Sequence, residues 1–176
     1  MNNFEFANPV RVVFGKGTIA RLSALIPAGS RVLMVYGGGS IKKNGIYDQV
    51  TNALNGFEVT EFSGIEANPH YETCMKAVDV VKKKNIDFLL AVGGGSVIDA
   101  TKFIAAAYYY EGEPWDILSK GGVIKKALPL GVVLTLSATG SEMNERSVIS
   151  RAETREKLNF ASPLVFPQFA ILDPEV

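Results

Sequence analysis

Short runs of apolar residues alternate along this chain with stretches in which apolar residues recur every three or four positions. An apolar run bounded by turn residues is typical of a strand buried on both faces, and the three-to-four spacing is typical of an amphipathic helix. Strands are expected over residues 4–14, 31–36, 57–62, 88–92 and 130–134, and helices over residues 18–26, 41–54, 71–84 and 96–107. This alternation predicts an α/β fold with a doubly wound, mostly parallel sheet covered by helices.

The pattern changes beyond Trp115. Residues 146–172 contain extended segments separated by the charged turn 151–157, and a small antiparallel hairpin is one arrangement of them. The chain stops at Leu172–Val176, directly after an apolar strand. Because an α/β domain usually ends on a helix or a polar tail, we expect one domain over residues 1–176, cut from a longer protein.

The strand expected at 88–92 runs directly into Gly93-Gly94-Gly95-Ser96. The glycines let the backbone turn tightly and leave its N–H groups uncovered. Ser96 and Asp99 have the spacing of a capping box at the start of the next helix, with Asp in place of the usual Glu. Free amides and a helix N-terminus pointing at one spot attract an anion such as a phosphate. The same residues also fit a tight strand–helix connection that binds nothing.

A second loop of this kind, Gly37-Gly38-Gly39-Ser40, follows the strand expected at 31–36. In open α/β sheets, ligands bind outside the carboxyl ends of the strands. Two glycine loops on that edge suit a ligand with two separated phosphate groups, such as a dinucleotide. The Gly-x-Gly-x-x-Gly fingerprint is absent, so the site is not expected to be a standard Rossmann site.

The first glycine loop also favours one dinucleotide over another. A carboxylate near this position would bind the ribose 2′-hydroxyl of NAD and repel the 2′-phosphate of NADP. Here Gly38 and Gly39 leave space, Ser40 offers a hydroxyl, and Lys42 and Lys43 add positive charge. The sequence therefore favours NADP over NAD, although a plain turn with solvated lysines would look the same.

Composition limits the other functions. The formal net charge is zero, which gives no electrostatic argument for a nucleic-acid partner or a membrane surface. Cys74 is the single cysteine, so no internal disulfide can form, and we expect it to be a small buried residue in a reducing compartment. The first residues lack the pattern of a signal peptide, and no stretch is apolar for the length of a membrane span. We expect a cytoplasmic location, and a homodimer is one assembly open to the chain.

The order and spacing of these motifs resemble the iron-containing (group III) alcohol dehydrogenase family, in particular its branch of butanol dehydrogenases and NADPH-dependent aldehyde reductases. The resemblance covers essentially the whole chain. The matching segments are Asn3-Phe4, Phe14-Gly15-Lys16-Gly17, Tyr36–Ser40, Glu66-Ala67-Asn68-Pro69, Val92–Asp99, Thr139–Glu142, Val148–Ser150 and Leu172-Asp173-Pro174.

The resemblance implies a set of cofactor-binding residues. Gly38, Gly39 and Ser40 would surround the adenosine ribose and its 2′-phosphate, and Gly94, Gly95 and Ser96 would hold the diphosphate. Thr135, Leu136 and Thr139 would line the adenine and ribose channel. Polar contacts would come from Asn68, Asn144 and Lys157.

Two further positions are ambiguous within this resemblance. Asp99 matches a family position, but helix capping would explain it without a ligand. Arg146 stands where a small or amide residue is expected, which leaves that contact in doubt.

The family's metal site, one aspartate and three histidines, belongs to a helical domain that follows the Asp-Pro strand. This chain has one histidine, His70, for which a surface or capping role is expected. We therefore expect neither catalytic nor metal-binding residues here, and iron or zinc only in a full-length enzyme acting on a small alcohol or aldehyde. The alternatives are a stand-alone nucleotide-binding module, or the same domain of a relative such as a glycerol dehydrogenase or a dehydroquinate-synthase-like enzyme.

Overall fold

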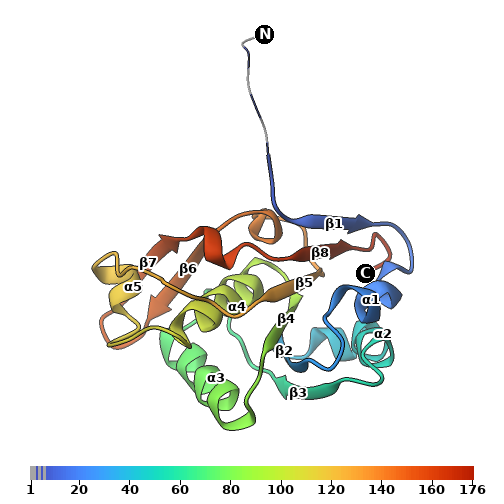
Figure 1. Ribbon diagram of the computed structural model, residues 1–176, viewed down its shortest axis with the longest axis horizontal. Coiled ribbons are helices and arrows are strands. Elements are labelled where there is room, and N and C mark those ends of the chain that lie inside the picture. Colours follow the sequence, from blue (N-terminus) through green and yellow to red (C-terminus); the bar gives the residue numbers. More distant parts are fainter. Residues whose placement is uncertain (1–2, 4, 6) are drawn as a thin grey trace.

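In the computed structural model, which describes residues 3, 5 and 7–176, a six-stranded sheet forms the centre of the chain (Figure 1). Its strands lie in the order β1-β8-β5-β4-β2-β3, and every neighbouring pair is parallel. The six strands are β1 (Arg11–Phe14), β2 (Arg31–Tyr36), β3 (Glu58–Phe62), β4 (Phe88–Gly93), β5 (Leu130–Leu134) and β8 (Phe169–Leu172). The expected α/β fold with a mostly parallel sheet is confirmed.

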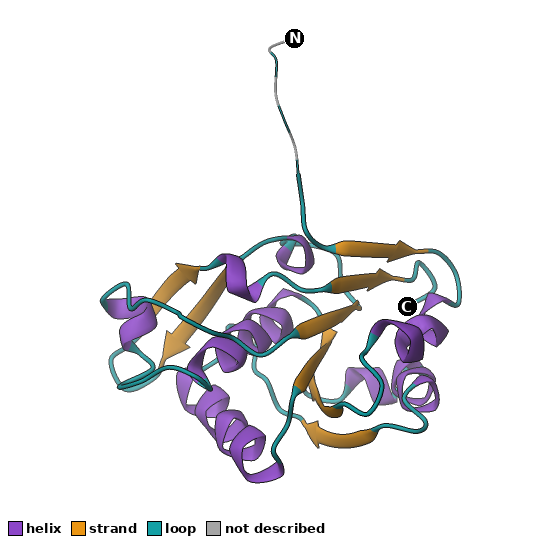
Figure 2. Ribbon diagram, viewed as in Figure 1, coloured by secondary structure: helices purple, strands orange, loops and turns teal. Residues whose placement is uncertain are grey.

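Helices cover both faces of this sheet, as Figure 2 shows. On one face, η1 (Thr18–Arg21), α1 (Leu22–Leu25) and α2 (Ile46–Ala53) pack against Phe88, Leu90 and Val92 of β4. On the other face, α3 (Tyr71–Lys84) and α4 (Gly95–Ala107) pack against Leu89 and Ala91 of the same strand. Alternate side chains of β4 thus enter two different cores, which is why its sequence is continuously apolar.

The late extended segments form the expected antiparallel hairpin. Strands β6 (Arg146–Arg151) and β7 (Glu156–Ala161) pair with each other in a separate two-stranded sheet, and Ile149 and Phe160 pack into the core beside α4. The remaining short elements are η2 (Ser40–Lys42), α5 (Asp116–Ser119), η3 (Ser141–Met143) and η4 (Pro163–Val165). Helix α5 was not expected from the sequence.

Several predicted boundaries are wrong. The first strand begins at Arg11, and residues 4 and 6 of the expected span lie outside the described residues. The helix expected over 41–54 begins only at Ile46, because Gly39 and Gly45, with φ of 96° and 78°, interrupt the chain with left-handed turns. The helix expected over 18–26 is a 3-10 turn followed by one α-helical turn, and Ile26 is already extended before Pro27.

The strand order creates a switch point between β2 and β4. From β2 the chain passes through α2 on one face to the edge strand β3, and from β4 it passes through α4 on the other face to β5. Neighbouring strands whose connections leave in opposite directions open a crevice at their carboxyl ends, which is the usual ligand site of such sheets. In the described part of the chain, no helix is long and apolar enough to cross a lipid bilayer.

Candidate functional site

The two glycine loops leave the sheet side by side at this switch point. Tyr36, the last residue of β2, is paired with Val92 near the end of β4. The loops that start at Gly37 and Gly94 therefore flank the same crevice. The two repeated motifs, 56 positions apart in the printed sequence, are brought together as the sequence analysis expected.

Helix α4 begins at the second loop without a side-chain cap. Its N-cap is Gly94, whose backbone is extended, and among the described residues no side chain caps the first turn with a hydrogen bond. The predicted capping box of Ser96 and Asp99 is therefore wrong: both residues lie inside the helix and bond elsewhere. The first amides of a helix have no acceptor within it, so this uncapped N-terminus of a 13-residue helix offers N–H groups and a positive dipole end to an anion.

Glycine is required at the start of α4 because another loop lies against it. A Cβ atom at Gly95 would overlap Thr139 Oγ1, and one at Gly94 would lie 3.3 Å from Leu136 Cβ. The Thr139 hydroxyl is itself fixed by a 2.8 Å hydrogen bond with Ser141 Oγ. The loop after β5 thus forms one wall of the crevice, with the exposed Leu136 side chain on its surface.

Asn68 and Lys157 meet beside the same helix start. The Asn68 N–H donates to Ser96 Oγ at 3.3 Å, and Lys157 Nζ, from β7, donates to Asn68 Oδ1 at 2.6 Å. Asn68 holds a left-handed backbone, with φ of 58°, in the loop between β3 and α3. Three segments far apart in the sequence therefore place a hydroxyl, an amide and an ammonium group next to one another.

Asp99 ties the hairpin to α4 instead of capping the helix. Its Oδ2 accepts the Val148 N–H at 3.0 Å, and its backbone carbonyl accepts the Ser147 hydroxyl at 2.8 Å. Burial raises the pKa of the Asp99 carboxyl, and the hydrogen bond from Val148 offsets this only in part. Within the described residues, Oδ1 of this carboxyl is buried and has no hydrogen-bond partner.

Lys102 is a polar residue of this region that the sequence analysis missed. Its side chain is fully buried, and Nζ donates to the carbonyl oxygens of Ser141 (2.6 Å), Asn144 (2.7 Å) and Arg146 (2.8 Å) and to Asn144 Oδ1 (3.1 Å). Burial lowers the pKa of Lys102 to about 8, so the group remains an ammonium at neutral pH. A lysine directly before the apolar run from Phe103 to Ala107 was the signal that could have revealed it.

Asn144, expected from the resemblance to contact the cofactor, is engaged within the chain. Besides receiving Lys102 Nζ, its Oδ1 accepts the Arg146 N–H at 2.8 Å, and its Nδ2 donates to the Gly140 carbonyl at 2.9 Å. These bonds fix the turn from Gly140 to Arg146. Arg146 itself is exposed on β6.

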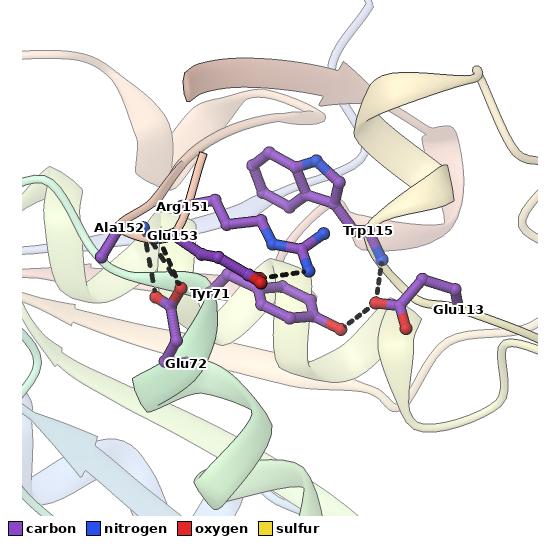
Figure 3. A network of polar contacts seen from close by, with 7 residues as sticks. All are labelled: Tyr71, Glu72, Glu113, Trp115, Arg151, Ala152 and Glu153. Atoms are coloured by element: carbon purple, nitrogen blue, oxygen red, sulfur yellow. Dashed lines mark hydrogen bonds and ion pairs between the residues drawn. The ribbon is translucent and has the colours of Figure 1, made fainter. Parts of the chain in front are cut away.

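A cluster of aromatic and charged side chains anchors the far end of the hairpin (Figure 3). The Arg151 guanidinium lies 5.1 Å from the ring of Tyr71 and 5.6 Å from that of Trp115, and it donates to Glu153 Oε2 at 2.9 Å. The Glu72 carboxylate accepts the Ala152 N–H at 3.2 Å. The hairpin is therefore held in place at two points, here and at Asp99, and this fixes the position of Lys157 on β7.

The first loop opens into a shallow cavity of about 280 Å³, lined by Tyr36, Gly37, Gly38, Gly39, Lys42, Ser63 and Gly64. A Cβ atom at Gly38 would meet no other atom within 4 Å, so the space expected beside this loop exists. Thr135 does not line this cavity. It lines a separate hollow of about 290 Å³ together with Phe14 and Pro174. Its N–H donates to the Gly93 carbonyl at 3.1 Å.

One of the two lysines expected beside the first loop is paired with a carboxylate. Lys42 Nζ lies 3.6 Å from Glu61 Oε2, a carboxylate on the neighbouring strand β3 that the sequence analysis did not consider. Lys42 lies beside the loop as expected, and a carboxylate from β3 balances part of its charge.

His70 and Cys74 show no arrangement suited to a metal. His70 occupies the N-cap position of α3, but its side chain makes no capping hydrogen bond, so only the position of the expected cap is right. Cys74 is buried, as expected, and burial raises the pKa of its thiol. Across the described ranges, no three His, Cys, Asp or Glu side chains are close enough to hold a metal ion. The described residues do not fit a metal centre.

The fold and the glycine-lined crevice define a Rossmann-like α/β domain. Comparison with protein families matches residues 9–174 to the model described as iron-containing alcohol dehydrogenase. The chain belongs to the iron-containing alcohol dehydrogenase family, as the resemblance implied.

Named relatives include two similar bacterial proteins. A probable NADH-dependent butanol dehydrogenase 1 of Bacillus subtilis is 57% identical, over 99% of this chain and 46% of its own length. The NADPH-dependent aldehyde reductase YqhD of Escherichia coli is 58% identical, with the same coverage. The crystal structure of NADH-dependent butanol dehydrogenase A from Thermotoga maritima superposes with a TM-score of 0.93 at 48% identity, over 99% of this chain and 45% of that one. The chain spans about half the length of the curated relatives it matches.

Replacing Lys102 by methionine tests its role as an anchor. Lys102→Met leaves the oxygens of Ser141, Asn144 and Arg146 without their common donor, so we expect the free energy of unfolding to fall by about 2–4 kcal/mol. Urea denaturation followed by circular dichroism measures this. Lys83→Met, which removes an exposed lysine near the end of α3, is the matched control and should change stability by less than about 0.5 kcal/mol. Equal stability of Lys102→Met and the wild-type chain would contradict the anchoring role.

Proposed function

We propose that this chain is the dinucleotide-binding domain of an alcohol dehydrogenase or aldehyde reductase that uses NADP in preference to NAD and interconverts alcohols and aldehydes. The observation that carries the proposal is the uncapped N-terminus of α4, which faces a second glycine loop across the switch point of the sheet. Such a crevice suits two phosphate-bearing halves of one ligand. Bound there, the cofactor would supply or accept the hydride.

The residues around α4 are suited to the diphosphate. Gly94 and Gly95 leave the first helix amides uncovered by side chains, and they also let the loop after β5 lie against the helix start, where a Cβ atom would be crowded by Leu136 or Thr139. Ser96 Oγ adds a hydroxyl, and Lys157, held by Asn68, brings a positive charge to the same side. These groups would orient the diphosphate while the rest of the ligand lies along the crevice.

The loop after β2 is suited to the adenosine ribose. Gly38, Gly39 and Ser40 carry no carboxylate, so nothing in the loop itself repels a 2′-phosphate, and the adjoining cavity has room for one. The names of the relatives do not decide the matter, because one of the two similar proteins is called NADH-dependent and the other NADPH-dependent. The preference for NADP therefore rests on the loop.

The reaction needs groups that this chain does not provide. Its one histidine cannot form a metal site, and the described carboxylates and Cys74 form none with it. We propose that activation of the substrate oxygen and closure over the nicotinamide come from the part of the relatives that this chain does not match, about half of their length. The cofactor-binding step alone belongs to this chain.

Substitution of Gly95 tests the diphosphate site. We expect Gly95→Ala to weaken NADPH binding at least about tenfold in calorimetric titration, because the added methyl group occupies the phosphate approach. The double variant Gly95→Ala/Thr139→Ala removes the overlap with Thr139 Oγ1 and should remain about tenfold weaker than Thr139→Ala alone. If the double variant binds as well as Thr139→Ala, the glycine serves only loop packing and the diphosphate assignment fails.

Substitution of Gly38 tests the choice of cofactor. We expect Gly38→Asp to weaken NADPH binding at least about tenfold while NADH binding is kept or improved, because the carboxylate repels the 2′-phosphate. Gly38→Asn, with the same shape and no charge, is the control. Gly38 is preferred to Gly39 because the positive φ of Gly39 would strain any side chain. Equal NADPH and NADH affinities in the unmutated chain would overturn the preference.

An activity assay tests whether this chain binds the cofactor without catalysing the reaction. The purified chain should bind NADPH in calorimetric titration yet oxidise it with butanal no faster than buffer does, because it lacks a group that activates the substrate oxygen. The full-length aldehyde reductase of E. coli, assayed in parallel, shows that the assay works. Butanal-dependent oxidation at an ordinary enzymatic rate, about 1 per second or faster, would refute the proposal.

A further inference from the structure

A four-residue cluster forms the rim of the cavity beside the first glycine loop. It comprises Tyr36 at the end of β2, Lys42 in η2, Tyr47 in α2 and Glu61 in β3. Tyr36 and Lys42 themselves line the cavity, so the cluster connects the cavity to the edge strand of the sheet. The side chains come from four different elements, and none of the motifs considered in the sequence includes Glu61.

Both carboxylate oxygens of Glu61 have polar partners within the cluster. Tyr36 Oη donates to its Oε2 at 2.7 Å, Tyr47 Oη donates to its Oε1 at 2.6 Å, and Lys42 Nζ lies 3.6 Å from Oε2. Burial raises the pKa of the Glu61 carboxyl, but the hydrogen bonds from Tyr47 and Tyr36 and the charge of Lys42 outweigh it and hold that pKa below its ordinary value. Glu61 is therefore ionised at neutral pH and balances the charge of Lys42.

Lys42 is held over the two tyrosine rings by the same arrangement. Its Nζ lies 5.3 Å from the centre of the Tyr36 ring and 4.5 Å from that of the Tyr47 ring, distances at which a cation is attracted to the ring face. The side chain nevertheless remains about half exposed, at 48%. It can therefore turn into the cavity when an anion enters, at the cost of its contacts with Glu61 and the rings.

We propose that the Lys42–Glu61 pair tunes the discrimination between NADPH and NADH, with Glu61 competing against the 2′-phosphate for the Lys42 ammonium. This inference rests on the proposed function, because it places the adenosine ribose beside Gly38 and Gly39. A 2′-hydroxyl carries no charge and gains little from the ammonium, whereas a 2′-phosphate gains an ion pair. Glu61 thereby reduces a preference that the carboxylate-free loop alone would make larger.

The test is removal of the Glu61 charge with its shape retained. Glu61→Gln keeps an oxygen for a tyrosine hydroxyl but frees Lys42, so the ratio of NADPH to NADH affinity should rise about threefold to fivefold. Lys42→Met should lower the ratio, and Glu61→Gln should have no further effect in the Lys42→Met background. Glu58→Gln removes an equal charge from an exposed position on the same strand and should leave the ratio unchanged.

Calorimetric titration with NADPH and NADH gives these affinity ratios. Titration with adenosine 2′,5′-bisphosphate and adenosine 5′-monophosphate gives the same comparison, with and without the 2′-phosphate, for the adenosine half of the cofactor alone. A rise in Glu61→Gln that disappears in the Lys42→Met background supports the inference. If wild type binds both cofactors but the ratio does not move in Glu61→Gln, or moves equally with and without Lys42, the inference is overturned and the proposed function stands. If wild type binds neither cofactor, both fall.

Discussion

The buried ammonium of Lys102 is the interaction on which the crevice depends. It reaches from the middle of α4 to the turn between Ser141 and Arg146. It thereby connects the helix that begins at the crevice with the loop that lines the crevice and with the hairpin that carries Lys157. Burying an unpaired charge would be strongly unfavourable, but four oxygen atoms surround this one. Since α4 lies at the centre of one core, a shift of this contact would move the helix, the loop and the hairpin together.

Lys102 and Lys42 differ because their surroundings differ. Lys102 is buried, and the atoms that accept its hydrogen bonds are uncharged oxygens. Carboxylates act on it only through their charge. Its role is to hold the backbone of the turn in place. Lys42 is half exposed and shares its charge with a carboxylate on the next strand. An exposed ion pair contributes little to stability, so Lys42 can exchange partners at small cost. The fixed charge of Lys102 therefore shapes the crevice. The exchangeable charge of Lys42 lies beside the first glycine loop, where we propose that NADP and NAD differ.

The elements with strong periodicity were predicted well. The helix over residues 71–84 has the predicted bounds, because its apolar spacing matches the face it buries. The strands over 31–36 and 130–134 agree as well, because they are continuous apolar runs buried on both faces. Prediction was wrong where glycines took left-handed turns inside an expected helix, as at Gly45, and where a polar side chain was assigned a local role. Asp99 was predicted to cap its own helix, yet it bonds to an amide 49 residues away.

The sequence alone determined the order of strands and helices and the placement of a glycine loop at the end of two buried strands. These are local properties: apolar period, turn chemistry and the freedom of glycine act over a few residues. Only the tertiary structure decided that the two loops flank a switch point, that Lys157 reaches Asn68 across 89 residues, and that Glu61 takes up the charge of Lys42. Such pairings depend on strand order and side-chain direction across separate elements, and no local pattern in the sequence records them.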